Sequence, residues 1–123
     1  MPDLHAIVID PQIIRNLRGL NPDDNGEFLR EIISIYLEDT PLRIADLDQS
    51  LAAGDVQRFA RAAHSVKGSS ANLGASILRA TCERLEQEAR QNGLKAVGPL
   101  VVQVKLEFDV AAGELRKLLV QPA

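Results

Sequence analysis

Apolar residues recur along this sequence at intervals of three and four positions, the spacing that lines up side chains on one face of an α-helix. The clearest pattern runs from Val97 to Leu118, where steps of four and three give one continuous apolar seam. Gly98-Pro99 marks the first turn of that helix. The same spacing predicts further helices over residues 11–18, 27–53, 56–72 and 75–92.

Local signals at the helix ends agree with this division. Asp10-Pro11 is a typical helix start, an N-cap followed by proline at the first helical position. Gly19–Gly26 has the composition of a loop, and Gly54-Asp55 provides a C-cap followed at once by an N-cap. Pro41 lies inside the second helix and removes a backbone donor, so we expect a kink there or a break.

The connections between these helices are short, which favours antiparallel neighbours. We therefore expect an all-α fold, an antiparallel up-and-down four-helix bundle with a short additional N-terminal helix. The chain has 123 residues, enough for a single domain over 1–123. Hydrophobic residues make up 46% and aromatic residues only 3%, so the core must consist mainly of Leu, Ile, Val and Ala.

Charge and cysteine content narrow the class of protein. The net charge is −3 with both signs interspersed, which is not the electrostatic footprint of a nucleic-acid-binding protein. No apolar run approaches the roughly 18 residues of a membrane span, and Met1–Asp10 lacks the features of a signal peptide. The single cysteine, Cys82, falls on an apolar seam and is expected to be a buried thiol. We expect a cytoplasmic protein without membrane contact.

His64 is the residue that stands out, because it lies away from the apolar side of its helix. At about 100° per residue, it points roughly 120° from the centre of the side that should face the core. The residues of that side are Val56, Phe59, Ala63, Val66 and Ser70. The imidazole is therefore expected to face solvent.

Small side chains surround this histidine on the helix surface. Its neighbours at three and four positions are Ala60, Arg61, Lys67 and Gly68, with Gln57 and Ala71 two turns away. A glycine in mid-helix costs roughly 1 kcal/mol relative to alanine, so Gly68 suggests clearance for an approaching protein. Lys67 lies one turn away and can reach a dianionic group on the ring.

Spacing alone leaves other interpretations open. The patch could be an exposed histidine beside a tolerated glycine. No carboxylate lies one turn from His64 on its own helix, which argues against a catalytic triad or a zinc site. The other histidine, His5, is given no specific role. Glycine-rich nucleotide-binding motifs are absent from the sequence.

The segment His64–Gly74, with the sequence HSVKGSSANLG, resembles the phosphorylation motif of histidine phosphotransfer (HPt) domains, the intermediates of multistep phosphorelays. Residues 51–55 and 82–86 are also similar to that family, and the resemblance is strong over about 28–90. It implies a four-helix bundle with an added N-terminal helix. It also implies that His64 is phosphorylated, that Lys67 assists the phosphoryl group and that Gly68 gives clearance.

The resemblance implies a phosphocarrier that is not an autonomous enzyme. His64 would exchange a phosphoryl group with aspartates on response-regulator receiver domains, including that of a hybrid sensor histidine kinase. The metal ion, Mg²⁺, would belong to the receiver, so no cofactor is expected on this chain. We expect a monomer that docks receivers through residues around His64. They are Gln57, Ala60, Arg61, Gly68 and Ala71, with Glu86 on the following helix.

Three other classes are weighed against this interpretation. An adaptor bundle without phosphate chemistry would be expected to lack the histidine, whereas His64, Lys67 and Gly68 are all present. The dimerising domain of a histidine kinase normally has an acidic residue directly after its histidine and a proline soon afterwards. Here Ser65 follows, and the next proline is Pro99. A metal-binding bundle would need inward-facing histidine and glutamate.

One position departs from the family pattern. Several members place Gln or Lys on the following helix within reach of the histidine, whereas here the corresponding stripe reads Arg79, Glu83, Glu86 and Arg90. Glu86 could accept a hydrogen bond from the imidazole, but it would also repel a phosphoryl group. Its role stays open at the level of sequence.

Overall fold

The structure, a computed structural model, describes residues 8–120, so His5 and most of the segment Met1–Asp10 lie outside it. All regular structure within this range is helical, as expected. The helices are α1 (Pro11–Leu20), α2 (Glu27–Ala53), α3 (Val56–Asn72), α4 (Ser76–Asn92) and α5 (Gly98–Leu119). No helix between residues 8 and 120 has both the length and the apolar character needed to cross a bilayer.

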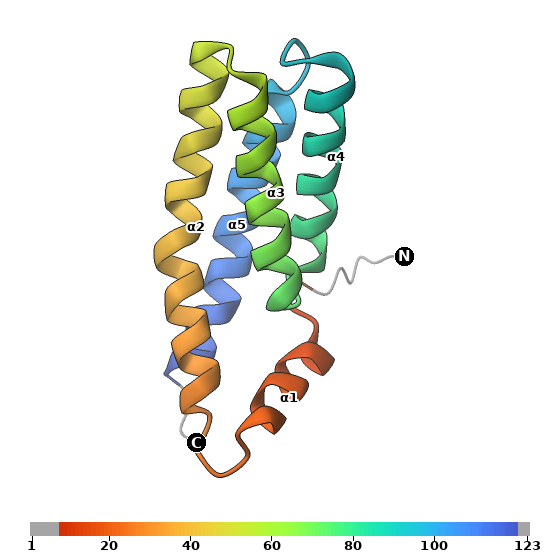
Figure 1. The fold of residues 1–123 in the computed structure, drawn as a ribbon. Coiled ribbons are helices and arrows are strands. Elements are labelled where there is room, and N and C mark those ends of the chain that lie inside the picture. The colour runs from red at the N-terminus through yellow and green to blue at the C-terminus, as the bar shows by residue number, and fades with distance from the viewer. Residues whose placement is uncertain (1–7, 121–123) are drawn as a thin grey trace.

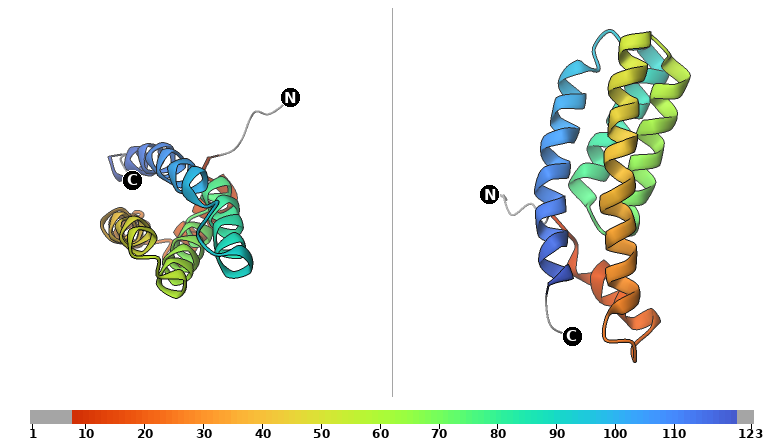
Figure 2. Two further views of the ribbon diagram at one scale, coloured as in Figure 1. Left: turned by 90° about the horizontal axis from the view of Figure 1, so that it is seen from above. Right: turned by 90° about the vertical axis from the view of Figure 1, so that its left-hand side faces the viewer.

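The four long helices form an up-and-down bundle (Figure 1). Seen along its axis, the bundle has a square arrangement in which α3 lies between α2 and α4, and α5 completes the ring (Figure 2). The short helix α1 lies across the lower end and packs against α2. The expected all-α four-helix bundle with an additional N-terminal helix is therefore confirmed.

Most helix ends occur where the capping residues indicated. The Asp10 side chain accepts a hydrogen bond from the backbone N–H of Gln12 at 2.9 Å, and Asp55 accepts one from Arg58 at 3.1 Å. Gly54 closes α2 in the left-handed conformation, with φ of 67°. The loop was expected to begin at Gly19, and this was wrong by two residues. Helix α1 continues to Leu20, and the loop begins at Asn21.

The helix α2 is continuous through Pro41 rather than broken. Its start has a cap that the sequence pattern did not identify. The carboxylate of Asp24 accepts hydrogen bonds from the backbone N–H groups of Gly26 and Phe28, each at 2.9 Å. Two otherwise unpaired donors at the helix start are satisfied in this way.

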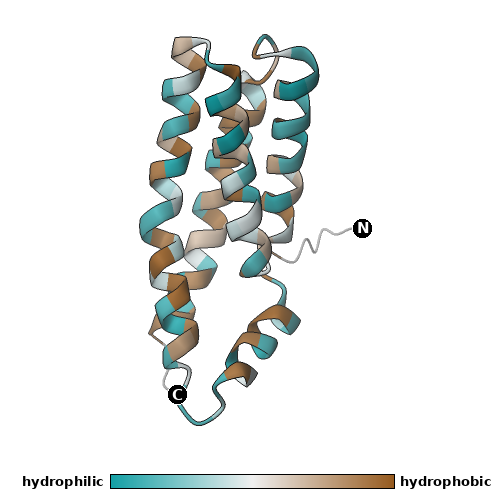
Figure 3. Cartoon of the chain, viewed as in Figure 1, coloured by the Kyte–Doolittle hydropathy of each residue, from teal (hydrophilic) through white to brown (hydrophobic). Residues whose placement is uncertain are grey.

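The core is mainly aliphatic, as the composition predicted, and each long helix contributes buried apolar residues to it. Apolar and polar residues are interspersed along every helix (Figure 3). Cys82 is buried there, and burial raises the pKa of its thiol to about 12. On α3, Phe59, Ala63 and Val66 are buried as expected. Val56 is 37% exposed instead, because it is the first residue of α3, at the end of the bundle.

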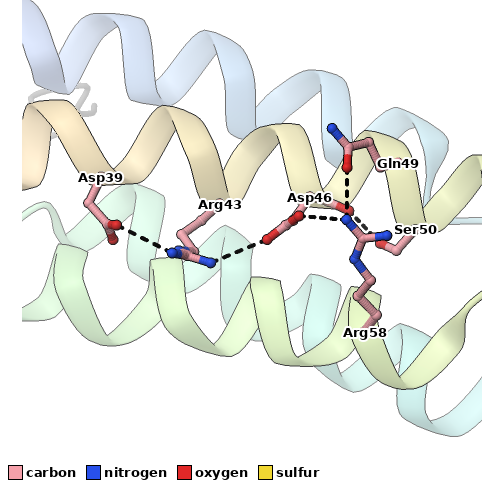
Figure 4. A network of polar contacts seen from close by, with 6 residues as sticks. All are labelled: Asp39, Arg43, Asp46, Gln49, Ser50 and Arg58. Carbon is pink, nitrogen blue, oxygen red and sulfur yellow. Dashed lines mark hydrogen bonds and ion pairs between the residues drawn. The ribbon is translucent and has the colours of Figure 1, made fainter.

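A polar network joins α2 to α3 near their connection (Figure 4). The Arg58 guanidinium lies 2.7 Å from the Asp46 carboxylate and also donates to the side-chain oxygen of Gln49. Arg43 bridges Asp46 to Asp39 along α2. The hydrogen bond from Arg58 holds the pKa of Asp46 below its usual range. This network fixes one end of the hairpin.

A buried hydrogen bond also fixes the rotation of α3 about its axis. The hydroxyl groups of Tyr36 on α2 and Ser70 on α3 lie 2.8 Å apart, and both residues are buried. A polar side chain in the core strongly favours the rotation that keeps it paired. With Ser70 directed inward, the opposite side of α3 must face solvent.

The start of α1 is attached to the connection between α3 and α4. The backbone N–H of Asp10 donates to the carbonyl of Gly74 at 2.9 Å. Gly74 has φ of +75°, and an added Cβ would lie 3.1 Å from the Asp10 backbone nitrogen and 3.1 Å from the Ile13 Cβ. Glycine is therefore needed here for both conformation and space.

We predict that Gly74→Ala destabilises the fold more than Gly54→Ala. Gly54 also has positive φ, but nothing lies within 4 Å of its added Cβ. Both changes incur the left-handed penalty of about 1–2 kcal/mol, and Gly74→Ala adds overpacking of about 1–3 kcal/mol. Urea denaturation of both variants measures the difference. Equal losses would contradict the tight contact between α1 and the α3–α4 connection.

Candidate functional site

His64 lies in the middle of α3 with its side chain 64% exposed. This agrees with the solvent-facing position that the helical spacing predicted. The ring contacts one acidic side chain, that of Glu86 on α4. The Nδ1 atom lies 3.2 Å from each carboxylate oxygen of Glu86. Helix α3 has no carboxylate one turn from His64, and the neighbouring helix α4 supplies one instead.

Glu86 receives two further donors besides the histidine. Its Oε1 lies 2.9 Å from the Lys67 ammonium, and its Oε2 lies 3.1 Å from Nε of Arg90. The Glu86 side chain is only 12% exposed. Burial acts to raise the pKa of Glu86, but the hydrogen bonds from Lys67, His64 and Arg90 outweigh it and hold the pKa below its usual range. Glu86 is therefore an ionised, well-held carboxylate.

An ionised carboxylate only accepts hydrogen bonds, so the Nδ1 atom of His64 must be the donor. In the neutral ring the second nitrogen, Nε2, then carries the lone pair. Within residues 8–120, Nε2 makes no hydrogen bond. Glu86 thus fixes the tautomer and orientation that leave Nε2 available as a nucleophile.

Lys67 follows His64 by one turn, as the sequence indicated, and its ammonium lies beside the ring through their shared partner Glu86. This ion pair was not foreseen, because the sequence cannot give the register of α3 against α4. Arg90 was noted only as part of a stripe on α4. Its contact with Glu86 adds a second cation to the site.

The expected docking residues are mostly accessible. Gln57, Arg61, Gly68 and Ala71 are exposed on α3, and a Cβ added to Gly68 would meet nothing within 4 Å. Ala60 was expected on this surface, and that expectation was wrong, since it is 1% exposed. Because α3 packs against both α2 and α4, its buried side is wider than one stripe and includes this short side chain.

An open hollow borders the histidine between α3 and α4. Its lining residues are Arg61, His64, Ser65, Glu86 and Arg90. Two arginines therefore flank the ring, on the side away from Gly68. Among the described residues, no group of three or more His, Cys, Asp and Glu side chains is placed to hold a metal ion.

Comparison with known proteins identifies the family. The model of the Hpt domain matches residues 31–118. The chain belongs to the Hpt domain family. Histidine-containing phosphotransfer protein 4 of Arabidopsis thaliana is 31% identical over 113 residues, covering 90% of this chain and 85% of that protein. The crystal structure of histidine-containing phosphotransfer protein B from Pseudomonas aeruginosa matches with a TM-score of 0.84 and 29% identity, over 93% of this chain and 96% of that one.

A third relative is longer than this chain. Multistep phosphorelay regulator 1 of Schizosaccharomyces pombe is 37% identical over 79 residues, which cover 64% of this chain but only 27% of the yeast protein. These similarities support the expected role of a phosphorelay intermediate and do not favour an adaptor bundle without phosphate chemistry. Hpt domains are phosphocarriers rather than classical enzymes, and their partners are receiver domains.

We predict that Gly68→Gln blocks phosphotransfer while raising thermal stability. Gly68 lies inside α3 with open space around it, so a good helix former should gain about 0.5–1 kcal/mol. The new side chain would obstruct a receiver one turn from His64. Thermal unfolding and the rate of transfer from a phosphorylated receiver measure the two effects.

Gly113→Gln is the matched control, because Gly113 also lies inside a helix, α5, with nothing within 4 Å of an added Cβ. It should show the stability gain with normal transfer. Normal transfer by the Gly68→Gln variant would contradict the clearance role.

Proposed function

We propose that His64 is the phosphorylated residue of this Hpt domain, taking a phosphoryl group from one receiver aspartate and passing it to another. The observation that carries the proposal is the exposed ring, whose Nδ1 donates to Glu86 and whose Nε2 is left without a hydrogen-bond partner within residues 8–120. Such a nitrogen is a competent nucleophile that needs no general base, since it already carries its lone pair.

The chemistry is a displacement at phosphorus. Nε2 attacks in line, the new N–P bond forms, and the bond between phosphorus and the receiver's carboxylate oxygen breaks. Such a reaction depends mainly on positioning and on stabilisation of the phosphoryl charge. The receiver supplies Mg²⁺ and an acidic pocket. This chain supplies the nucleophile, and it has no kinase activity of its own.

Lys67 is proposed to stabilise the phosphoryl group. Its ammonium already lies at the site, held by the carboxylate that also holds the ring. A phosphoryl group on Nε2 carries about 1.5 to 2 negative charges and would compete with Glu86 for this cation. Lys67 would then move from one anion to the other across a short distance.

Receivers are proposed to dock over the exposed side of α3. Gly68 and Ala71 leave one region of this surface without large side chains, and Gln57 and Arg61 border that region. Arg61 and the arginine on α4, Arg90, suit the acidic rim of a receiver active site. We further propose a single domain over 1–123 that works as a monomer in the cytoplasm, with a hybrid sensor histidine kinase as one phosphoryl source.

We predict that His64→Gln abolishes phosphorylation and leaves the bundle folded. The ring is exposed and contributes nothing to the core, so helicity should be unchanged. The test is incubation with a receiver charged by acetyl phosphate, followed by detection of acid-labile label. His5→Gln, the same change at the chain's other histidine, is the control and should label normally. Acid-labile label on the His64→Gln variant would refute the assignment.

We predict that Lys67→Ala slows phosphotransfer by about tenfold or more without weakening the fold. A charge-assisted contact to the phosphoryl group is worth about 1.5–3 kcal/mol. The measurement is single-turnover transfer from the receiver. Lys105→Ala serves as control, since Lys105 pairs with Asp48 at 2.8 Å, away from His64. If both variants transfer at the wild-type rate, Lys67 is only a surface charge.

A further inference from the structure

The carboxylate at position 86 is unusual for the site it occupies. It is the one acidic group that pairs with the His64 ring among the described residues, and it lies where the phosphoryl group would bring more negative charge. Lys67 on α3 and Arg90 on α4 also bind it. Arg61, on α3, is the remaining charged residue that lines the hollow beside the ring.

Phosphoryl transfer to Nε2 leaves the Nδ1 proton where it was. The neutral ring gains a bond to phosphorus, the receiver departs as a free carboxylate, and no proton needs to move. The phosphorylated ring then bears one positive charge. That charge is adjacent to Nδ1, which donates to Glu86, so the carboxylate and the cationic ring form an ion pair.

The fate of this proton decides how readily phosphorus leaves again. If Nδ1 keeps its proton, the leaving group is neutral imidazole. If Nδ1 loses it, the leaving group is an imidazolate anion, which departs far more slowly because it is a much stronger base. The same proton therefore controls both transfer to a receiver and loss to water.

The ring proton lies among charges of both signs. Besides the phosphorylated ring itself, Lys67, Arg90 and Arg61 are positively charged. Facing them are one negative charge on Glu86 and about two on the phosphoryl group. Replacing Glu86 by a neutral side chain removes one negative charge, and the ring proton becomes the least stabilised positive charge.

We propose that Glu86 keeps the Nδ1 proton on phosphorylated His64 and so maintains the phosphoryl group in a readily transferable, short-lived form. This inference rests on the proposed function of His64. Glu86 acts through the ring and does not touch the phosphoryl group, so it is a positioning residue. Its negative charge is what stabilises the Nδ1 proton. A glutamine at this position could accept a hydrogen bond from Nδ1 without carrying a charge, and would favour a longer-lived phosphohistidine.

The test compares Glu86→Gln with wild type and with Glu83→Gln. Glu83 is a matched control, because it lies on the same helix and pairs with Arg79 at i,i+4 as Glu86 does with Arg90. Phosphorylated protein is isolated, and transfer to a receiver and hydrolysis are timed from about pH 5 to 9. Ring-nitrogen NMR of the same samples reports the Nδ1 proton directly.

For Glu86→Gln we expect the pH at which both rates decline to move down by about one unit, because the loss of the Nδ1 proton shifts to lower pH. Above that range both rates should be about tenfold lower than in wild type at the same pH. Glu83→Gln should behave as wild type. Wild-type pH profiles in the Glu86→Gln variant, with normal labelling of His64, would overturn the inference and leave the proposed function intact.

Two further outcomes keep the two proposals separate. If wild-type protein takes no label at all, the proposed function fails before Glu86 is tested. If Glu86→Gln does not fold, the wild-type NMR titration decides alone. Nδ1 losing its proton below neutral pH in the phosphorylated wild-type ring would overturn the inference, and retention above neutral pH would support it.

Discussion

The packing of α3 on α4 determines whether a histidine on one helix can hold a carboxylate on the other. Ala60, one turn before His64 on α3, is a small buried side chain, and small side chains let helix axes approach closely. At this distance the Glu86 carboxylate reaches His64 and Lys67 together. A larger residue in place of Ala60 would be expected to push the helices apart beside these contacts.

The same packing determines which charged groups surround the histidine. One poorly exposed carboxylate is shared by a lysine, an arginine and an imidazole. Both cations remain partly exposed, with 24% of the Lys67 side chain and 53% of the Arg90 side chain accessible, so each can turn towards an incoming anion. The resting site is therefore poised for rearrangement around an incoming anion. The helices themselves need not move.

The sequence predicted the fold well because its signals are local. Caps such as Asp10 and Asp55 and the seam on α5 act within a few residues, so helix limits and the solvent-facing position of His64 could be deduced. The burial of Ala60 and the Lys67–Glu86 pair could not, because both depend on the distance and register between helices. Helical periodicity gives a direction around one axis. It contains no information on which residue of a neighbour lies opposite.

The connection between α3 and α4 has only three residues, Leu73–Ala75, so His64, Lys67, Glu86 and Arg90 all belong to one helical hairpin. The reactive group and its counter-ions are therefore close in sequence, and a short loop closure brings them together at little entropic cost. Such a site can assemble early during folding. The reacting groups therefore come from the α3–α4 hairpin alone, while α2 contributes from outside it by holding the rotation of α3 through the Tyr36–Ser70 hydrogen bond.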